Sequence, residues 1–532
     1  MAEYSSHIVD QHGQPMARAV TDTPFEGASH INPDIARFRP WNYSAQTAIS
    51  QDREMLASRI HDIARNDGWA SAGVTRQVDS IIGSGWRLTS DPIAKALGIE
   101  QEEAAELGEQ FEMHWQLYAN DPDAWCDAGR RKTVGGNMAL ALRTQLWDGE
   151  AFGRILWLER GGPYATAMQL LDPDRLSTPP GRIESDHLRD GVELGANGEP
   201  LAYWIRVQHP GDMLSSTSNG YRWERVPRET AWGRRIVVHH FEDGRAGQVR
   251  GISPVAIIVK KLKMLGKYDE AELQAAVLNA MLAAYVESPL DHEQLADMID
   301  DTGGKLDAYQ ASRLSYWRDA PPLAIPGVKL NFLFPGEKIN LSPGNRPNPG
   351  FEMFQRAALR NIASALGVSY EQLSMDWSQV NYSSARAALL EVWKGLTARS
   401  GFFGHGFLLP WYAAFLEEIT ETGRVKLPKR APAFRQAKAA YCNARWIGPG
   451  RGWVDPMKEA EAALARIAGG LSTLEKECAE QGVDWRDVLR QQARENTYAE
   501  SLGLPPVHSR TLPKKKTIEN DMVDEQSTKE AA

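Results

Sequence analysis

Two groups of side chains in this chain have ligand types that could bind a metal ion. Residues 239–243 read HHFED and are the densest local group of imidazole and carboxylate ligands. Neighbouring residues of a β-strand point to opposite faces, so the two histidines could not easily share one ion. Asp121, Asp123 and Asp127 resemble a calcium-binding loop but lack its glycine and its distal glutamate. We therefore expect no metal site: the histidines fit a strand end, and the aspartates fit a loop and a helix N-cap.

Catalytic motifs are missing from the sequence. Residues 303–306 read GGKL, which lacks both the spacing and the Ser or Thr of a phosphate-binding P-loop. Neither the HExxH zinc motif nor the GxSxG nucleophile motif occurs. A nuclease or a packaging ATPase would need a carboxylate–metal cluster or a P-loop. We therefore expect that the protein is not an enzyme and needs no cofactor.

Four lysines gather on one predicted helix. They are Lys260, Lys261, Lys263 and Lys267. In a ring of subunits they would become stacked rings of positive charge around the central opening. A solvated helix face explains any one of them equally well, so both interpretations stay open. Because we expect the four to spread around most of the helix circumference, at most one or two of them should face such an opening.

Residues 370–384 form a polar and aromatic segment between two predicted helices. The segment reads YEQLSMDWSQVNYSS and combines aromatic rings with several hydroxyls. Polar connections between helices of this kind are often functional loops on the protein surface. The alternative is an ordinary connection between helices, with Trp377 packed into a core.

Long helices must position these side chains. After Ser253-Pro254, where proline suits a first helical turn, apolar residues recur at largely helical spacing, and no further proline occurs before Pro289. A helix of thirty-odd residues would span about 50 Å, which suits a strut, with a possible bend near Gly266. Other helices are predicted at 51–65, 69–82, 101–118, 349–366, 385–399 and 407–420. Residues 433–500 are predicted to be almost all helical, with interruptions at Gly448-Pro449-Gly450 and at Asp455-Pro456.

Residues 150–240 have the pattern of a small unit of strands. Short apolar runs are separated there by Gly, Pro and Asn clusters. Asn197-Gly198 between two of the runs is a hairpin signal. The predicted strands are 152–158, 167–171, 192–194, 201–207 and 236–240. The whole chain therefore belongs to the α+β class.

Composition limits the class of protein. With 532 residues the chain is too long for one core, so two to four structural units are expected. We expect no membrane span and no secretory signal, and Cys126, Cys442 and Cys478 should be reduced thiols. The net charge of −9 argues against a protein that grips duplex DNA. An ordinary acidic cytosolic protein would have the same charge.

Four blocks of the sequence, in order, resemble the portal proteins of lambda-like tailed bacteriophages. They are 64–89 (ARNDGWASAGVTRQVDSIIGSGWRLT), 247–288 (containing RGISPVAIIVKKLKML), 343–393 (opening PGNRPNPGFEMFQRAALRNI) and 445–485 (opening RWIGPGRGWVDPMKE). The resemblance covers nearly the whole chain and is least clear over the first 50 residues. It implies a ring-forming portal fold with a mixed α/β wing, long stem helices, a small α/β clip and a helical crown.

The resemblance also implies a division of the chain into parts. These are an N-terminal arm (1–50), the wing (51–250), stem helix 1 (251–285), the clip (286–342), stem helix 2 (343–368), a tunnel loop (369–384), a channel helix with a return to the wing (385–432), the crown (433–505) and a disordered tail (506–532). The tunnel loop would be the narrowest part of the channel, and its tip candidates are Trp377, Gln379, Val380 and Asn381.

The function implied by the resemblance is a ring of about twelve copies at one capsid vertex. Double-stranded DNA would be packaged and ejected through this ring. Its partners would be the large terminase subunit, the major capsid protein, the scaffold or its protease, and later the head-completion proteins, with no membrane involved. The protein would be found in the virion, and in the host cytoplasm during assembly. The alternative is another head protein, either a terminase-like enzyme or a head–tail adaptor.

Overall fold

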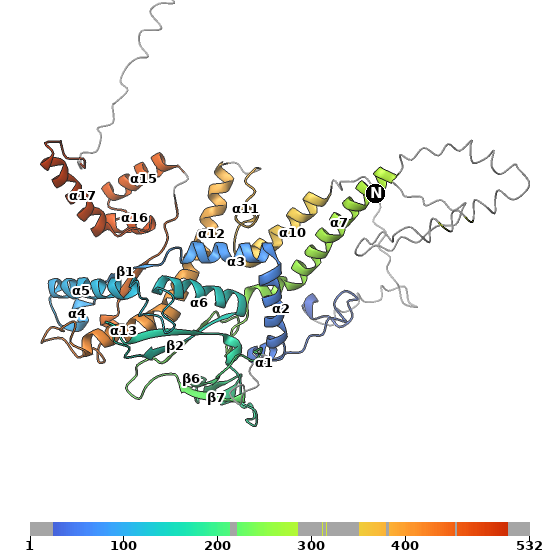
Figure 1. Ribbon diagram of the computed structural model, residues 1–532, viewed down its shortest axis with the longest axis horizontal. Coiled ribbons are helices and arrows are strands. Elements are labelled where there is room, and N and C mark those ends of the chain that lie inside the picture. The colour runs from blue at the N-terminus through green and yellow to red at the C-terminus, as the bar shows by residue number, and fades with distance from the viewer. Residues whose placement is uncertain are drawn as a thin grey trace, which may run out of the picture.

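The computed structural model describes residues 25–212, 221–285, 311, 315, 350–378, 382–452 and 455–508. Helices and small antiparallel sheets form one body, from which α7 (Val259–Tyr285) and α10 (Phe351–Leu366) project side by side (Figure 1). The mixture of helix and sheet confirms the predicted α+β class. Within these ranges no helix is both long enough and apolar enough to cross a membrane.

The remaining helices surround and extend the sheets. Three short helices of the 3-10 type lie at Glu26–Ala28, Pro173–Arg175 and Pro254–Ile258. The α-helices are α1 (Ala45–Ser50), α2 (Arg53–Asn66), α3 (Gly68–Ile81), α4 (Ala94–Leu97), α5 (Gln101–Ala119), α6 (Val134–Asp148), α11 (Tyr370–Ser374), α12 (Tyr382–Phe403), α13 (Leu409–Glu421), α14 (Lys438–Tyr441), α15 (Pro456–Ala468), α16 (Leu474–Glu480) and α17 (Trp485–Ser501).

The described residues form three antiparallel sheets. Their strand orders are β3-β2-β8, β4-β5-β6-β7 and β1-β9. The strands are β1 (Arg87–Ser90), β2 (Glu150–Trp157), β3 (Thr166–Leu171), β4 (Leu188–Arg189), β5 (Val192–Leu194), β6 (Pro200–Arg206), β7 (Trp223–Pro227), β8 (Val237–Phe241) and β9 (Ala444–Ile447).

The predicted hairpin is confirmed between β5 and β6. Gly198 has a φ of +81°, the left-handed conformation that a tight turn needs and that glycine adopts without steric cost. The N–H of Gly195 donates to the carbonyl of Glu199 at 2.8 Å and closes the turn. The five strands expected within residues 150–240 are present, with ends that differ by at most two residues. The two further strands expected at 329–333 and 338–341 lie outside the described residues.

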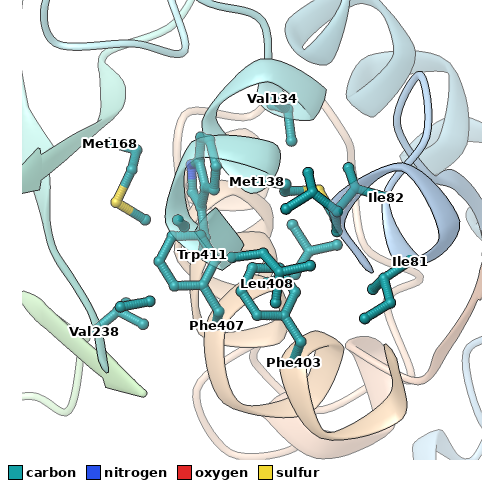
Figure 2. Packing of buried hydrophobic residues seen from close by; sticks show 14 of the residues in the cluster. Ile81, Ile82, Val134, Met138, Met168, Val238, Phe403, Phe407, Leu408 and Trp411 are labelled. Carbon is teal, nitrogen blue, oxygen red and sulfur yellow. The ribbon is translucent and has the colours of Figure 1, made fainter. Parts of the chain in front are cut away.

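The main core lies between the sheet β3-β2-β8 and the helices. Figure 2 shows Trp411 and Phe407 between Met168 and Val238 of the sheet and Met138 and Ile81 of the helices. Trp411 is fully buried and donates its indole N–H to the hydroxyl of Tyr118 at 2.9 Å, so its one polar atom is satisfied. Burial of a side chain of this size contributes about 3 kcal/mol or more to stability. α13 is therefore buried inside the body.

A single helical path runs from the predicted channel segment into this core. α12 and α13 are joined by a π-turn at Gly404–Leu408, in which the N–H of Leu409 donates to the carbonyl of Gly404. Pro410 follows at once; it has no N–H and its ring crowds the preceding turn, so a widened turn accommodates it. The break between the helices predicted at 385–399 and 407–420 is therefore a π-turn in one continuous path.

The first long helix begins where the sequence predicts a helix start. Ser253 caps a 3-10 turn by accepting a bond from the N–H of Val255 at 3.0 Å, and Pro254 occupies the first position of that turn. α7 then continues through Gly266 without a break. The predicted clip, 286–342, lies outside the described residues except for 311 and 315.

The expectation of almost continuous helix over 433–500 is wrong at one place. β9 (Ala444–Ile447) is a strand, and it pairs with β1 so that Arg87 lies opposite Ile447 and Ser90 opposite Ala444. The pairing joins segments that are far apart in the sequence, and a four-residue strand carries too little periodicity to be recognised. It ties the start of the C-terminal helices to the body.

Candidate functional site

The described part of the candidate site consists of α7, α10 and the segment that follows α10. The two long helices pack through buried leucine and isoleucine side chains, with Leu262 and Ile362 almost fully buried. Farther out, Tyr268 of α7 stacks on Phe351 of α10 with ring centroids 5.6 Å apart and meets Phe354 edge-on at 5.0 Å. Such aromatic pairs add about 0.5–1.5 kcal/mol each beyond area burial. The packed pair of α7 and α10 therefore supports the segment between α10 and α12.

The four lysines of α7 are all exposed, but they differ in their neighbours. Lys261 donates to the side-chain oxygen of Asn361 on α10, and Lys263 lies 3.8 Å from the carboxylate of Asp62 on α2. Consecutive residues of a helix are rotated by about 100°, so Lys260, Lys263 and Lys267 fall within about 60° of one another.

The expectation that the four lysines spread around most of the helix is therefore wrong. Residues that are three, four or seven positions apart lie on the same side of a helix. Lys260, Lys263 and Lys267 are separated by these intervals. Lys261 alone points toward α10. Whether the shared side faces a channel stays a prediction.

The segment after α10 is described up to residue 378 and is well ordered at its root. α10 ends at Gly367, whose φ of +71° is left-handed, and α11 begins with a capping box between Ser369 and Gln372. Leu373 is almost fully buried, and a Cβ on Gly73 of α3 would lie 3.3 Å from it. The root is thus packed onto α3 (Figure 1).

The predicted tip residues fall at the edge of the described structure. Trp377 is 44% exposed, which is not the burial expected of a tryptophan packed into a core. Gln379, Val380 and Asn381 lie outside the described residues. The candidate list therefore stays a prediction, with the exposure of Trp377 in its favour.

The carboxylate of Asp376 accepts the hydrogen bonds of the last described turn. One carboxylate oxygen accepts bonds from the N–H of Ser378 at 3.1 Å and from its hydroxyl at 2.6 Å. The other oxygen lies 3.4 Å from the hydroxyl of Tyr370 and 3.6 Å from the guanidinium of Arg356 on α10. These bonds, the Ser378 hydroxyl first, lower the pKa of Asp376, so the carboxylate stays charged.

The histidines of residues 239–243 lie on opposite faces of β8, as predicted. His239 is bonded to Glu150 at 2.9 Å, whereas His240 packs against Phe403 with ring centroids 5.8 Å apart. They do not meet around a common point. Among the described residues, only Asp172, Asp174 and His209 bring three ligand atoms within 4.8 Å of one another. Asp121, Asp123 and Asp127 do not meet in this way.

A buried ionic cluster lies just before the turn into α7, and no local sequence pattern predicted it. Glu150 is fully buried and accepts bonds from Arg250 at 2.9 Å, from Arg53 at 3.1 Å and from the N–H of Gly251 at 2.9 Å. Burial alone would raise the pKa of Glu150, but the neighbouring Arg250, followed by Arg53 and the bonded His239, holds this pKa well below its usual value.

Arg250 of this cluster also donates hydrogen bonds to backbone carbonyls. Its guanidinium donates to the carbonyls of Pro173 at 2.9 Å, Leu176 at 2.7 Å and Asp190 at 2.9 Å. Its partners come from distant parts of the chain, so no local pattern could have identified it. Because Arg250 lies just before the turn into α7, it fixes where α7 leaves the body.

Comparison with known proteins places these features in a family context. A family model described as the lambda family of phage portal proteins matches residues 32–399. The chain is 32% identical over 490 residues to portal protein B of Escherichia phage lambda, which covers 90% of each chain. It is 33% identical over 483 residues to the portal protein of Escherichia phage N15, which covers 88% of this chain and 89% of that protein.

Further proteins are similar to the chain at lower identity. A probable portal protein of Halomonas phage phiHAP-1 is 26% identical over 473 residues, with 88% of this chain and 85% of that protein covered. Among solved structures, a chain from the neck of an empty GTA particle has a TM-score of 0.41 at 16% identity, covering 88% of this chain and 95% of that chain. A chain from the virion of a native gene transfer agent particle has a TM-score of 0.38 at 15% identity, with 88% and 95% covered.

Proposed function

Because this chain belongs to the lambda family of phage portal proteins, we propose that about twelve copies close into a ring through which double-stranded DNA is packaged and ejected. As a portal protein it is a structural component of the virion that associates with itself and with the capsid. A head-to-tail contact that closes by rotation gives such a ring. The comparisons give no support to the alternative of a terminase-like enzyme or a head–tail adaptor.

In this proposal the long helices form the wall of the channel. α7 and α10 are the two stem helices, and the segment between α10 and α12 is the tunnel loop at the constriction. The observation that carries this assignment is the half-exposed Trp377 beyond a firmly packed loop root. A constriction needs a fixed base and a free edge, and this segment supplies a fixed base with an exposed aromatic ring at its edge.

The remaining partners follow from the same proposal. The large terminase subunit docks on residues 286–342 during packaging, and head-completion proteins later occupy that surface. The major capsid protein and the scaffold or its protease contact the wing during assembly in the host cytoplasm. The terminase supplies the ATP hydrolysis, so the portal chain has neither ATPase nor nuclease activity. Portal proteins as a family are structural rather than catalytic.

The test is to replace residues 377–381 with a short Gly-Ser linker. Rings and proheads should form normally, because the stem contacts and the packed root at Leu373 remain. Filled heads should lose DNA or fail to complete packaging. A matched control replaces the five exposed wing residues 180–184 in the same way and should leave DNA retention unchanged.

Two results would contradict the proposal. If the shortened variant does not form rings while the control does, Trp377 is a packing residue and the loop assignment is wrong. If the shortened variant gives full, stable and infectious particles, the segment is not the constriction.

A further inference from the structure

A basic segment lies on the body, away from the two long helices. Residues 424–438, between α13 and α14, contain six lysines and arginines and no aspartate or glutamate. The segment leads into α14, which contacts α4, and α4 lies at the end of the body away from α7 and α10 (Figure 1). This local excess of positive charge contrasts with the net charge of −9 of the whole chain.

Apolar side chains fix the basic segment to the core. Val425 and Phe434 are almost fully buried, and Phe434 stacks on Tyr441 with ring centroids 5.6 Å apart. The hydroxyl of Tyr441 donates to the carbonyl of Pro432 at 2.7 Å. The backbone of the segment is therefore held at both ends, and its exposed side chains have a fixed base.

Three cations of the segment project from this base. The N–H of Ala431 donates to the carbonyl of Pro428 at 2.9 Å and closes a turn with Lys429 and Arg430 at its centre. Lys426 lies just before the turn. All three cations are exposed, and in the described part of the chain none of them has a hydrogen bond or an ion pair.

The other three cations of the segment already have partners. Arg424 donates to the carbonyl of Pro163. Arg435 lies 3.3 Å from the carboxylate of Glu417, and Lys438 donates to a backbone carbonyl at 3.4 Å. The three cations at and before the turn therefore carry the charge that can bind another molecule.

The chemistry of this surface fits a phosphate backbone better than an acidic protein. Contact surfaces between proteins usually have an apolar and aromatic centre. Here the large apolar side chains point into the core, and every exposed residue of 424–430 is a lysine or an arginine. Binding to a DNA backbone needs charge alone, since each Lys or Arg that neutralises a phosphate releases counterions.

We propose that Lys426, Lys429 and Arg430 form a DNA contact outside the channel, which binds the phosphate backbone of duplex DNA without regard to its sequence. The inference rests on the proposed function, since packaged DNA is the duplex that this surface would meet. It goes beyond that function by assigning a DNA contact to the wing side of the body. Three phosphate contacts leave the binding weak at physiological salt, in agreement with the net charge of −9.

The test measures how tightly the purified full-length protein binds a fluorescently labelled duplex of about 30 base pairs, by anisotropy at about 50 to 200 mM salt. The variant replaces Lys426, Lys429 and Arg430 with glutamine. Because these side chains are exposed and unbonded, the changes should leave the fold and the ring intact.

A matched control replaces three cations elsewhere with glutamine, namely Arg59 and Arg65 of α2 and Arg143 of α6. They are also exposed and have no hydrogen bond or ion pair within the described ranges. The control therefore removes the same total charge from a different part of the surface.

At about 50 mM salt, the triple variant at the turn should bind the duplex about tenfold more weakly than the parent. The slope of log affinity against log salt should become shallower by about 2 to 3, since each lost phosphate contact changes it by about 1. The control should keep a slope close to that of the parent. Equal slopes in the triple variant and the parent, or no binding by the parent at low salt, would overturn the inference.

Two further measurements keep the test decisive. If the triple variant does not fold, Lys429→Gln alone replaces it and should reduce the slope by about 1, and an unchanged slope would overturn the inference. If the parent binds a labelled polyglutamate peptide more tightly than the duplex, and loses that binding in the variant, the partner is an acidic protein and the inference is wrong. A chain that forms no ring would contradict the proposed function, but its binding to the duplex can still be measured, so the two ideas fail separately.

Discussion

The imidazole of His240 occupies the space that a side chain would need at Gly406. A Cβ on Gly406 would lie 2.0 Å from Nδ1 of His240, far inside van der Waals contact. His240 belongs to β8, and Gly406 belongs to the π-turn that joins α12 to α13. The contact therefore fixes the π-turn against the main sheet, at the point where α12 ends and α13 begins.

Gly406→Ala should destabilise the protein by about 1–3 kcal/mol, because the added methyl group forces the histidine or the helix to move. Chemical denaturation with a fluorescence readout measures this difference. Gly395→Ala is the matched control in the same helical path, where no atom lies within 4 Å of the added Cβ. It should be neutral or slightly stabilising, by up to about 1 kcal/mol. Equal stability of the two variants would show that the close approach is not important.

The same histidine should make the protein sensitive to mild acid. Burial, helped by the nearby His239, lowers the pKa of His240 to about 4. The folded protein therefore keeps it neutral while the unfolded chain binds a proton below about pH 6.5, so stability should fall as the pH drops from about 6.5 to about 4. The loss attributable to this group is about 3 kcal/mol. His240→Asn should flatten this part of the curve of unfolding free energy against pH, and an unchanged slope would contradict the assignment.

The buried pair of Glu150 and Arg250 should be costly to break. Glu150→Gln leaves Arg250 without its compensating charge, and breaking a buried pair in this way costs about 3–5 kcal/mol. The matched control is Glu193→Gln, which removes the partner of Arg225 in a more exposed pair at 2.6 Å. That change should cost about 1 kcal/mol or less. Urea denaturation of both variants measures the contrast, and similar losses would mean that the buried cluster is not the anchor of the stem.

Lysines on the two sides of α7 should have different effects. Lys260→Gln together with Lys267→Gln removes charge from the side that three lysines share and should leave ring formation intact. If that side faces the channel, the packaging rate should depend less steeply on salt, because fewer cations meet the phosphates. Lys261→Gln is the control on the other side and should leave the salt dependence unchanged. An unchanged salt dependence in the double variant would place these lysines on a solvated face.

Much of the helical fold follows from local patterns in the sequence. Pro254 predicts the start of the first stem, and Asn197-Gly198 predicts the hairpin, because both signals depend on the backbone preferences of one or two residues. An exposed segment at Trp377 was also predicted, but the expected loop 369–384 is wrong over residues 370–374, which form helix α11. These features need no knowledge of distant partners.

Features that depend on long-range contacts could not be predicted in this way. The pairing of Arg87 with Ile447 joins two strands of four residues each, and nothing in either strand identifies its partner. α6 was not expected, because glycines at 135 and 136 obscure a helix that begins with the cap Thr133. The Asp376 contacts depend on α10 lying beside the loop root, which only the folded chain reveals.

The central claim is that copies of this chain close into a ring around a DNA-sized opening. The most direct measurement is native mass spectrometry of the purified full-length chain, combined with electron microscopy down the ring axis. The account predicts a closed ring of about twelve copies with a central opening. A chain that stays monomeric at every concentration and salt tested, or that forms only open filaments, would contradict it.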